Sequence, residues 1–282
     1  RSLVVTGTHG KTTTASLLTW VLESAGLNPS FLIGGIPRNL GQGARFTDSE
    51  WFVIEGDEYD TSFFDKRSKF VHYLPEVAIL NNLEFDHADI FPTLADIQLS
   101  FRRFIHLIPR NGLLLANGDE ANITPLLDIR HCPVKRFGLG VDNELRASGL
   151  VLKEDSSEFE LGGTRFRIPM VGELNVRNAL AVTAAARHCG IRDSVIQSAF
   201  DSFSSVKRRM EVRGEAGGVT VIDDFGHHPT AIRETVRALR VKFPGRRIWA
   251  VFEPRSNTTR RNVFQQELVD ALERADVVVV AE

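Results

Sequence analysis

The stretch GTHGKTTT, at residues 7–14, limits what this chain can fold into more than any other feature. The apolar run SLVV comes directly before it, and the segment KTTTASLLTWVLESAG, at residues 11–26, continues it with the pattern of a helix. Gly7 and Gly10 allow the backbone to turn its N–H groups inward, and the positive end of a following helix favours phosphate. A strand, a glycine-containing turn and a helix in this order predict a phosphate loop in an α/β domain.

The predicted loop is short at its front end. The usual pattern has a glycine six residues before the lysine, and Val5 stands there instead. In such a loop Lys11 reaches the β- and γ-phosphates of a nucleotide, and the hydroxyl of Thr12 binds Mg²⁺. The alternative is a chance glycine turn, but the strand before it and the helix after it argue against that interpretation.

Composition excludes several classes of function. The chain has 282 residues, a formal net charge of −2 and a pI near 6.5, so it lacks the basic field that nucleic-acid binding requires. Its apolar runs are far shorter than a membrane span. We therefore expect no nucleic-acid or membrane partner. Cys132 and Cys189 are too few for a metal cluster, and we interpret them as buried thiols of a cytoplasmic protein.

The rest of the first two hundred residues continues the α/β pattern. Continuous apolar runs suit central parallel strands, which are buried on both faces. Short alternating segments at 144–169 predict antiparallel hairpins. We expect strands at 2–7, 29–35, 50–58, 76–82 and 112–119, and helices at 94–108, 172–190 and 192–203.

Near residue 210 the pattern restarts as a smaller βαβαβ unit. The predicted strands are 218–225, 246–254 and 276–282, and the predicted helices are 229–243 and 258–275. We expect a central domain at 1–209 with a mostly parallel sheet, and the start of a smaller Rossmann-like α/β domain at 210–282. Both ends of the sequence look cut, so we expect a fragment of a longer protein.

Two further candidates for metal binding lie where strands end. Glu55 follows the run WFVI, and His87 follows ILNNLEFD. The carboxyl ends of parallel strands meet along one edge of a sheet, beside the phosphate loop. Glu55 and His87 are therefore expected to converge on a second Mg²⁺ near the γ-phosphate.

Four spaced motifs give the chain a resemblance to the Mur ligase family of amide-forming enzymes. They are GTHGKTTT, NLEFDHAD, VGELNVRNA and DDFGHHPT, and their order and spacing cover nearly the whole chain. The family's short loop G-T-[HN]-G-K-T accounts for the missing front glycine. The resemblance implies a three-domain enzyme, of which this chain would hold the central ATPase domain and part of the carboxyl-terminal domain, without the uridine-nucleotide domain.

The resemblance also implies roles for individual residues. The catalytic residues would be Lys11, Glu55 and His87, and Mg²⁺ would be held by Thr12, Glu55 and His87. ATP would be bound by Gly7, Thr8, His9, Gly10, Lys11, Thr12, Thr13, Asn175, Asn178, Arg209, Asp224 and His227. From the sequence alone, the two asparagines are equally well interpreted as helix caps or as polar residues on a helix face.

The sequence departs from the family pattern in two places. Several relatives carry a carbamylated lysine in the helix after the metal-binding histidine, whereas LADIQLSFRRF, at residues 94–104, has no lysine. That second-metal arrangement is therefore not expected here. Phe225 replaces the tyrosine found in the L-alanine-adding branch.

The stretch EGDEYDTSFFDKRSKFVHY resembles the branch that joins L-alanyl-γ-D-glutamyl-meso-diaminopimelate to UDP-N-acetylmuramate through an acyl phosphate, in peptidoglycan recycling. EPRSNTTRR points to the same branch, because a peptide with several carboxylates needs cationic donors. The expected substrate-binding residues are Asp57, Glu58, Arg255 and Arg260. The alternatives are the L-alanine-adding ligase of the same family, and a phosphate-loop switch module whose output is conformational.

Overall fold

The computed structural model describes residues 1–255, 258–261 and 263–281. Its main feature is an eight-stranded sheet with the order β3-β2-β4-β1-β5-β6-β7-β8, in which every neighbouring pair is parallel except β2 and β3. The strands are β1 (Ser2–Thr6), β2 (Ser30–Leu32), β3 (Ala44–Arg45), β4 (Phe52–Glu55), β5 (Val77–Leu80), β6 (Leu113–Asn117), β7 (Val134–Gly138) and β8 (Leu145–Arg146). The predicted α/β class with a mostly parallel sheet is confirmed.

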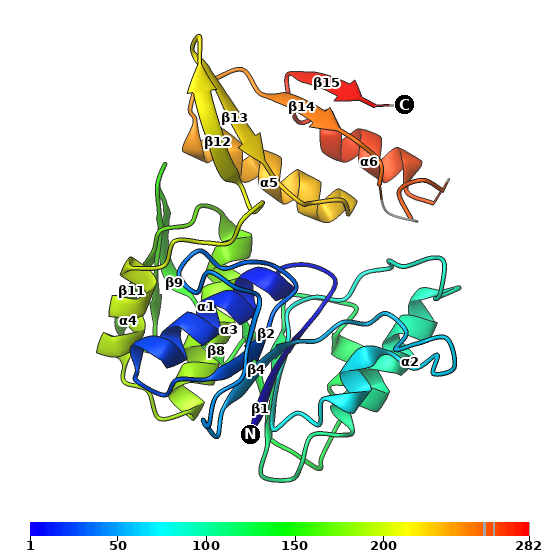
Figure 1. Cartoon of the computed structure of the whole chain (residues 1–282), viewed down its shortest axis with the longest axis vertical. Coiled ribbons are helices and arrows are strands. Elements are labelled where there is room, and N and C mark those ends of the chain that lie inside the picture. The colour runs from blue at the N-terminus through cyan, green and yellow to red at the C-terminus, as the bar shows by residue number, and fades with distance from the viewer. Residues whose placement is uncertain (256–257, 262, 282) are drawn as a thin grey trace.

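Helices cover both faces of this sheet, which explains why its central strands are continuously apolar (Figure 1). Successive residues of β1 alternate between two cores: Leu3 and Val5 belong to the core under α1 and α3, and Val4 belongs to the core under α2. The helices are α1 (Lys11–Ser24), α2 (Leu94–Ile105), α3 (Glu173–His188) and α4 (Asp193–Asp201), with short 3₁₀ turns at η1 (Lys69–His72) and η2 (Thr124–Leu126).

The predicted hairpin region is confirmed except at its start. The strands β9 (Ser148–Leu152), β10 (Ser157–Leu161) and β11 (Thr164–Ile168) form a separate antiparallel sheet. Residues 145–146 instead form β8, which pairs in parallel with β7 at the edge of the main sheet. Sequence analysis missed β7 because VKRFG has only two buried positions, Phe137 and Gly138, and two charged residues in succession.

The second unit is α/β, as predicted, but its strand pairing differs. The strands β12 (Glu211–Ala216) and β13 (Val219–Asp223) form an antiparallel hairpin, and β14 (Trp249–Phe252) pairs in parallel with β15 (Val277–Val280). The helices α5 (Pro229–Lys242) and α6 (Gln265–Leu272) pack against each other. In the described part of the chain β13 and β14 lie in separate sheets, so the predicted continuous βαβαβ sheet is wrong.

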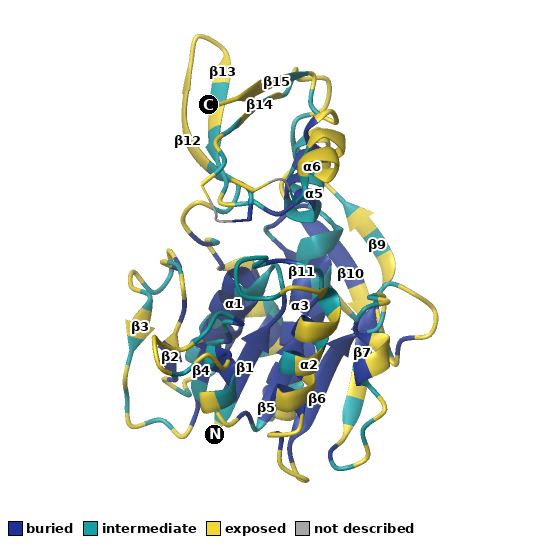
Figure 2. Ribbon diagram, turned by 90° about the vertical axis from the view of Figure 1, so that its right-hand side faces the viewer, coloured by how far each residue is buried: buried dark blue, intermediate teal, exposed yellow. Residues whose placement is uncertain are grey.

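Burial explains this difference in pairing. Figure 2 shows the central strands of the large sheet buried and the strands of the second unit largely exposed. Trp249 is 59% exposed and Val251 is 75% exposed. The core of the second unit is small and is built around Ile232, Ala271 and Leu272. Little apolar area therefore holds β13 against β14, since stabilisation scales with the area removed from water.

Helix α6 is shorter than predicted. The helical pattern was expected from residue 258, but the helix begins at Gln265, after Phe264 as its N-cap residue. The ring of Phe264 packs edge-on against Phe85, with ring centroids 6.0 Å apart, and against His228 at 5.2 Å. This tertiary contact fixes the backbone of Phe264 outside the helical conformation.

Both cysteines are free thiols, as expected, with Cys132 buried and Cys189 half-buried. Among the described helices, we find none whose length and apolar character would let it cross a bilayer.

Gly56 immediately follows Glu55 at the end of β4 and should tolerate no side chain. A Cβ there would lie 2.5 Å from Cγ2 of Thr6, whose hydroxyl is fixed by a hydrogen bond to the Ile79 carbonyl. We expect Gly56→Ala to lower the free energy of unfolding by roughly 1–3 kcal/mol, the usual effect of overpacking. Urea denaturation measures this.

Gly214→Ala is the matched control, because a Cβ at Gly214 meets no atom within 4 Å and its φ is not in the left-handed region. Its effect should stay within about 0.5 kcal/mol. Equal stabilities for the two variants would contradict the packing described around Glu55.

Candidate nucleotide site

A cavity of about 580 Å³ lies at the junction of the two units. The phosphate loop and the carboxyl ends of β2 and β4 form one wall, and the segments around β12, β13 and the start of α5 form the other. Its lining carries five Lys or Arg side chains and four Asp or Glu side chains: Lys11, Lys207, Arg208, Arg209, Arg213, Glu55, Asp57, Glu211 and Asp223. This mixture suits a polyphosphate bound together with a cation.

The phosphate loop has the predicted backbone. Gly7 and Gly10 have φ values of 131° and 79°, which favour glycine. A Cβ on Gly10 would also lie 2.7 Å from Oδ1 of Asn178. Gly10 is the N-cap residue of α1 and offers no side chain to the first N–H groups of that helix. The loop and the helix start therefore form an anion site open to the cavity.

Lys11 is held by a buried ion pair. Its Nζ donates to both carboxylate oxygens of Glu58, at 3.0 and 2.9 Å, and to the Gly7 carbonyl at 2.6 Å. Glu58 is 3% exposed and also contacts Nε2 of His87 at 3.0 Å. His87 has a φ of 53°, a left-handed conformation that is uncommon for a residue with a side chain. That backbone directs its ring toward Glu58.

Burial disfavours the charged forms of Lys11, Glu58 and His87, but the attraction between these groups outweighs that effect. Burial alone lowers the pKa of Lys11, but the charge and hydrogen bonds of Glu58 outweigh it, so the pKa of Lys11 is raised. Burial raises the pKa of Glu58, and the charge of Lys11 together with His87 reverses that, so its pKa is lowered. The pKa of His87 is raised, because Glu58 outweighs the effect of burial. The ion pair is therefore fully charged near neutral pH.

The oxygen donors predicted to bind Mg²⁺ lie together on the other side of Lys11. The Thr12 hydroxyl donates to Glu55 Oε1 at 2.9 Å, and the backbone N–H of Gly34 donates to Oε2 at 2.7 Å. Arg209, from the junction between the units, donates to the Thr12 hydroxyl at 3.1 Å. A hydroxyl and a carboxylate at the start of a helix are hard oxygen donors of the kind that Mg²⁺ prefers.

Glu55 and His87 line the same cavity, as their positions at strand ends predict. They lie in different clusters, however: Glu55 is paired with Thr12, and His87 with Glu58.

Two consecutive asparagines that sequence analysis left out support the loop from β5. The side chain of Asn82 accepts from the N–H of His9 at 2.8 Å and donates to its carbonyl at 3.0 Å. Asn81 donates to the Thr14 hydroxyl at 2.9 Å. The two asparagines directly after the apolar run EVAIL were a visible signal, because polar residues at a strand end face the loop edge of a parallel sheet.

The two asparagines of α3 that were predicted to bind ATP lie in different places relative to the phosphate loop. Asn178 is 2% exposed and lies against Gly10 of the loop. Asn175 donates to the Val171 carbonyl at 2.9 Å and lines a second cavity of about 260 Å³, which also contains Thr13 and Arg209. Arg209 lines both cavities, so the larger and the smaller cavity adjoin at this residue.

In the second unit, the two residues predicted to bind ATP have different environments. His227 lines the large cavity, and its Nε2 lies 3.9 Å from a carboxylate oxygen of Asp86. Asp224 turns to the backbone, accepting from the N–H groups of Met210 at 2.9 Å and Gly226 at 2.7 Å. It therefore ties the residue before β12 to the turn after β13.

The predicted substrate residues also differ in environment. Asp57 lines the cavity and pairs with Lys69 at 2.7 Å. Arg255 pairs with Glu253 at 2.7 Å on the surface, and Arg260 is exposed. Neither arginine lines the large cavity. Part of the motif EPRSNTTRR, residues 256 and 257, lies outside the described residues.

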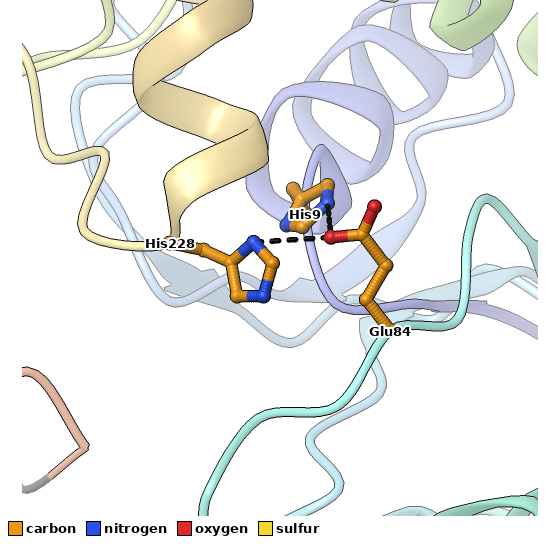
Figure 3. Close-up of side chains that lie close together, drawn as sticks. All are labelled: His9, Glu84 and His228. Carbon is orange, nitrogen blue, oxygen red and sulfur yellow. Dashed lines mark ion pairs between the residues drawn. The ribbon is translucent and has the colours of Figure 1, made fainter. Parts of the chain in front are cut away.

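A second cluster, which sequence analysis did not identify, joins the units beside the phosphate loop. Figure 3 shows His9 from the loop, Glu84 from the segment after β5 and His228 from the start of α5 pointing toward one another. Oε2 of Glu84 lies 3.1 Å from Nε2 of His9 and 3.0 Å from Nδ1 of His228. Burial, together with the charge of His9, lowers the pKa of His228 to about 4.

Comparisons with known proteins agree with this arrangement. The Mur ligase middle domain family matches residues 5–186, and the Mur ligase glutamate ligase domain family matches residues 208–282. The chain is 48% identical, over 98% of its length, to UDP-N-acetylmuramate–L-alanyl-γ-D-glutamyl-meso-2,6-diaminoheptandioate ligase of Haemophilus influenzae, and it spans 62% of that protein. It is 35% identical to UDP-N-acetylmuramate–L-alanine ligase of Variovorax paradoxus, of which it spans 60%.

A solved structure shows the same fold. The chain superimposes on a murein peptide ligase from Psychrobacter arcticus with a TM-score of 0.74 at 35% identity, covering 99% of this chain and 62% of that one.

The depressed pKa of His228 predicts a loss of stability in weak acid. A folded-state pKa of about 4, below the usual value of 6.5, means that the neutral form stabilises the fold; this stability is complete above about pH 6.5 and is lost as the pH falls toward 4. From about pH 7.5 to about pH 5 the expected loss is about 2 kcal/mol. The titratable groups facing His228 are His9, Glu84 and Asp86.

Urea denaturation of the protein and of His228→Asn at both pH values measures this loss. Asparagine can still cap helix α5, so the variant removes the titration while keeping the cap. The difference between the two proteins isolates His228 from His87, whose raised pKa acts above about pH 6.5. An identical pH dependence in both would contradict the assignment.

Proposed function

Because this chain belongs to the Mur ligase family, we propose that it supplies the ATP site of a ligase that joins L-alanyl-γ-D-glutamyl-meso-diaminopimelate to UDP-N-acetylmuramate. We place the boundary between its central and carboxyl-terminal domains at residues 209 and 210. One observation carries the proposal: Lys11 and Arg209 flank the paired Thr12 hydroxyl and Glu55 carboxylate in one cavity between the units.

The proposed reaction transfers the γ-phosphoryl group of ATP to the carboxylate of UDP-N-acetylmuramate, giving an acyl phosphate and ADP. The amine of the peptide then attacks the carbonyl carbon, the C–O bond to phosphate breaks, and the amide and inorganic phosphate are released. Both steps concentrate negative charge, so positioned cations and N–H donors matter more than a nucleophilic side chain.

The residues of the chain suit that requirement. The N-terminus of α1 and Lys11 bind the phosphates, and Arg209 adds a cation from the domain junction. Thr12 and Glu55 would hold Mg²⁺, which would offset the charge of the phosphates. Glu58 keeps Lys11 charged and in place, and His87 shares that carboxylate.

The adenosine part of ATP is proposed to lie toward Asn175. The smaller cavity that contains Asn175 adjoins the phosphate region at Arg209. Asn178 supports this arrangement from behind, by its contact with Gly10.

The peptide acceptor is favoured over L-alanine by two observations. The chain is 48% identical to a ligase named for the peptide and 35% identical to one named for L-alanine. The segment EGDEYDTSFFDKRSKF also forms an ordered loop that exposes Phe63 and Phe64, at 82% and 93%. An exposed aromatic pair in the same segment as Asp57 gives an extended acceptor a surface to contact.

Loss of the Thr12 hydroxyl should weaken Mg-ATP binding. We expect Thr12→Val to raise the dissociation constant roughly 10- to 100-fold, because a hydrogen bond to a charged group contributes about 1.5–3 kcal/mol. Isothermal titration of the 282-residue chain with Mg-ATP measures this.

Thr19→Val is the control on the same helix, since within the described part of the chain the Thr19 hydroxyl bonds only to the Ala15 carbonyl, and Thr19 does not line the cavity. It should bind Mg-ATP as the unmodified chain does. Equal affinities for the Thr12→Val variant and the unmodified chain would contradict the assigned metal site.

Acceptor choice is tested on the protein that contains this chain at the length of its curated relatives. Phosphate release is measured with ATP and UDP-N-acetylmuramate, adding either the tripeptide or L-alanine. We expect release only with the tripeptide. Turnover with L-alanine alone would support the other ligase, and release without any amine would support a nucleotide switch.

A further inference from the structure

The cluster formed by His9, Glu84 and His228 has the chemistry of a transition-metal site. One ligand atom from each side chain lies within 4.8 Å of the others. Two imidazoles and one carboxylate form a common donor set for Zn²⁺, with a fourth position left to water. This cluster is separate from the oxygen donors of Thr12 and Glu55, which belong to the nucleotide site.

Hydrogen bonds fix the tautomer of His228 in the form that a metal requires. Nε2 of His228 lies 3.1 Å from the Phe85 carbonyl, which can only accept, so Nε2 carries the proton. Nδ1 accepts a long hydrogen bond, 3.3 Å, from the N–H of Thr230, so Nδ1 carries a lone pair and no proton, and a metal ion bound there would replace this weak contact. A metal-binding histidine usually donates its other ring N–H to a carbonyl or carboxylate, as His228 does here.

In this tautomer two hydrogen-bond acceptors face each other. Nδ1 of His228, which carries no proton, lies 3.0 Å from Oε2 of Glu84. Two acceptors at this distance repel unless a positive charge lies between them.

His9 is the member of the cluster whose ring nitrogens have no hydrogen-bond partner among the described residues. The side chain of His9 is 8% exposed, and its Nε2 lies 3.1 Å from Oε2 of Glu84. Among the described residues, both ring nitrogens of His9 and Oε2 of Glu84 are buried without a hydrogen-bond partner. Unpartnered buried polar atoms are costly and need an explanation.

We propose that His9, Glu84 and His228 bind a divalent transition-metal ion of the Zn²⁺ type. His9 belongs to the phosphate loop and His228 to the first turn of α5, so the ion ties the second unit to the nucleotide-binding unit (Figure 3). Glu84 completes the set, while its other oxygen accepts from the hydroxyl of Thr230 at 3.0 Å. The proposal rests on this geometry and is independent of the proposed ligase reaction.

Titration of the 282-residue chain with Zn²⁺, followed by calorimetry, tests the site. We expect one ion per chain, and a dissociation constant at least about tenfold weaker in His9→Asn and in His228→Asn, because loss of even a supporting partner costs about 10- to 100-fold. Asparagine at position 228 keeps the helix cap, and the His9→Asn substitution gives the loop GTNGKT, so both variants should fold. Circular dichroism checks this.

His227→Asn is the matched control, because His227 is adjacent to His228 but outside the cluster. It should bind Zn²⁺ as the unmodified chain does. Co²⁺ gives a second readout, because a bound Co²⁺ ion with few ligands absorbs visible light. At one Co²⁺ concentration this absorption should be clear in the unmodified chain and in His227→Asn and much weaker in the two cluster variants.

The unfolding temperature gives a third readout, because the proposed ion ties the two units together. At one Zn²⁺ concentration, the unfolding temperature should rise clearly more for the unmodified chain and for His227→Asn than for either cluster variant. Absence of stoichiometric binding would overturn the proposal. So would binding of undiminished affinity in both cluster variants, since the ion would then lie elsewhere, for example at Glu55 or His87.

Discussion

The buried ion pair between Lys11 and Glu58 is the interaction on which the site depends. An unpaired ammonium group under the phosphate loop would be strongly destabilising, so Glu58 allows a charged Lys11 to be present before any anion arrives. The same carboxylate binds His87. Three elements are thereby tied together: the loop, the segment after β4 and the segment after β5. A phosphate that approaches Lys11 must compete with Glu58, and each shift of Glu58 also affects His87.

The sequence was sufficient for the parts of the fold set by local rules. The order of strand, glycine turn and helix around Lys11 required a phosphate loop, and the uniformly apolar central strands required a sheet covered on both faces. The positions of Thr12 and Glu55 followed from the rule that loop and strand ends meet at one edge. The pairing of β13 and β14 could not be read in the same way, because their valines and Trp249 are exposed and burial does not fix their register.

Contacts between residues that are distant in the sequence were the second feature that could not be predicted. Glu58 is one of several acidic residues in EGDEYD, and only tertiary packing shows that it, rather than Asp57, is buried against Lys11. His228 is likewise one of two adjacent histidines before a proline, and sequence alone suggests a polar helix entry. Its burial against His9 depends on where α5 docks, which no local pattern states. Among the residues that sequence analysis missed, Asn82 had the clearest signal, since it is a polar residue that closely follows an apolar strand.

The docking of the second unit onto the loop follows from this distribution of polar groups. His228 caps α5 and bonds to the Phe85 carbonyl, Thr230 bonds to Glu84, and Arg209 reaches Thr12. Each contact ends on the phosphate loop or on the segment after β5, and the apolar core that the second unit can offer is small. An interface held by directional polar contacts is more easily opened and re-formed than one held by apolar burial, because water can replace the partners. The side chains that hold the two units together, such as Arg209 and His228, also contribute to the charge around the cavity. Opening of the cavity and the charge within it are therefore linked.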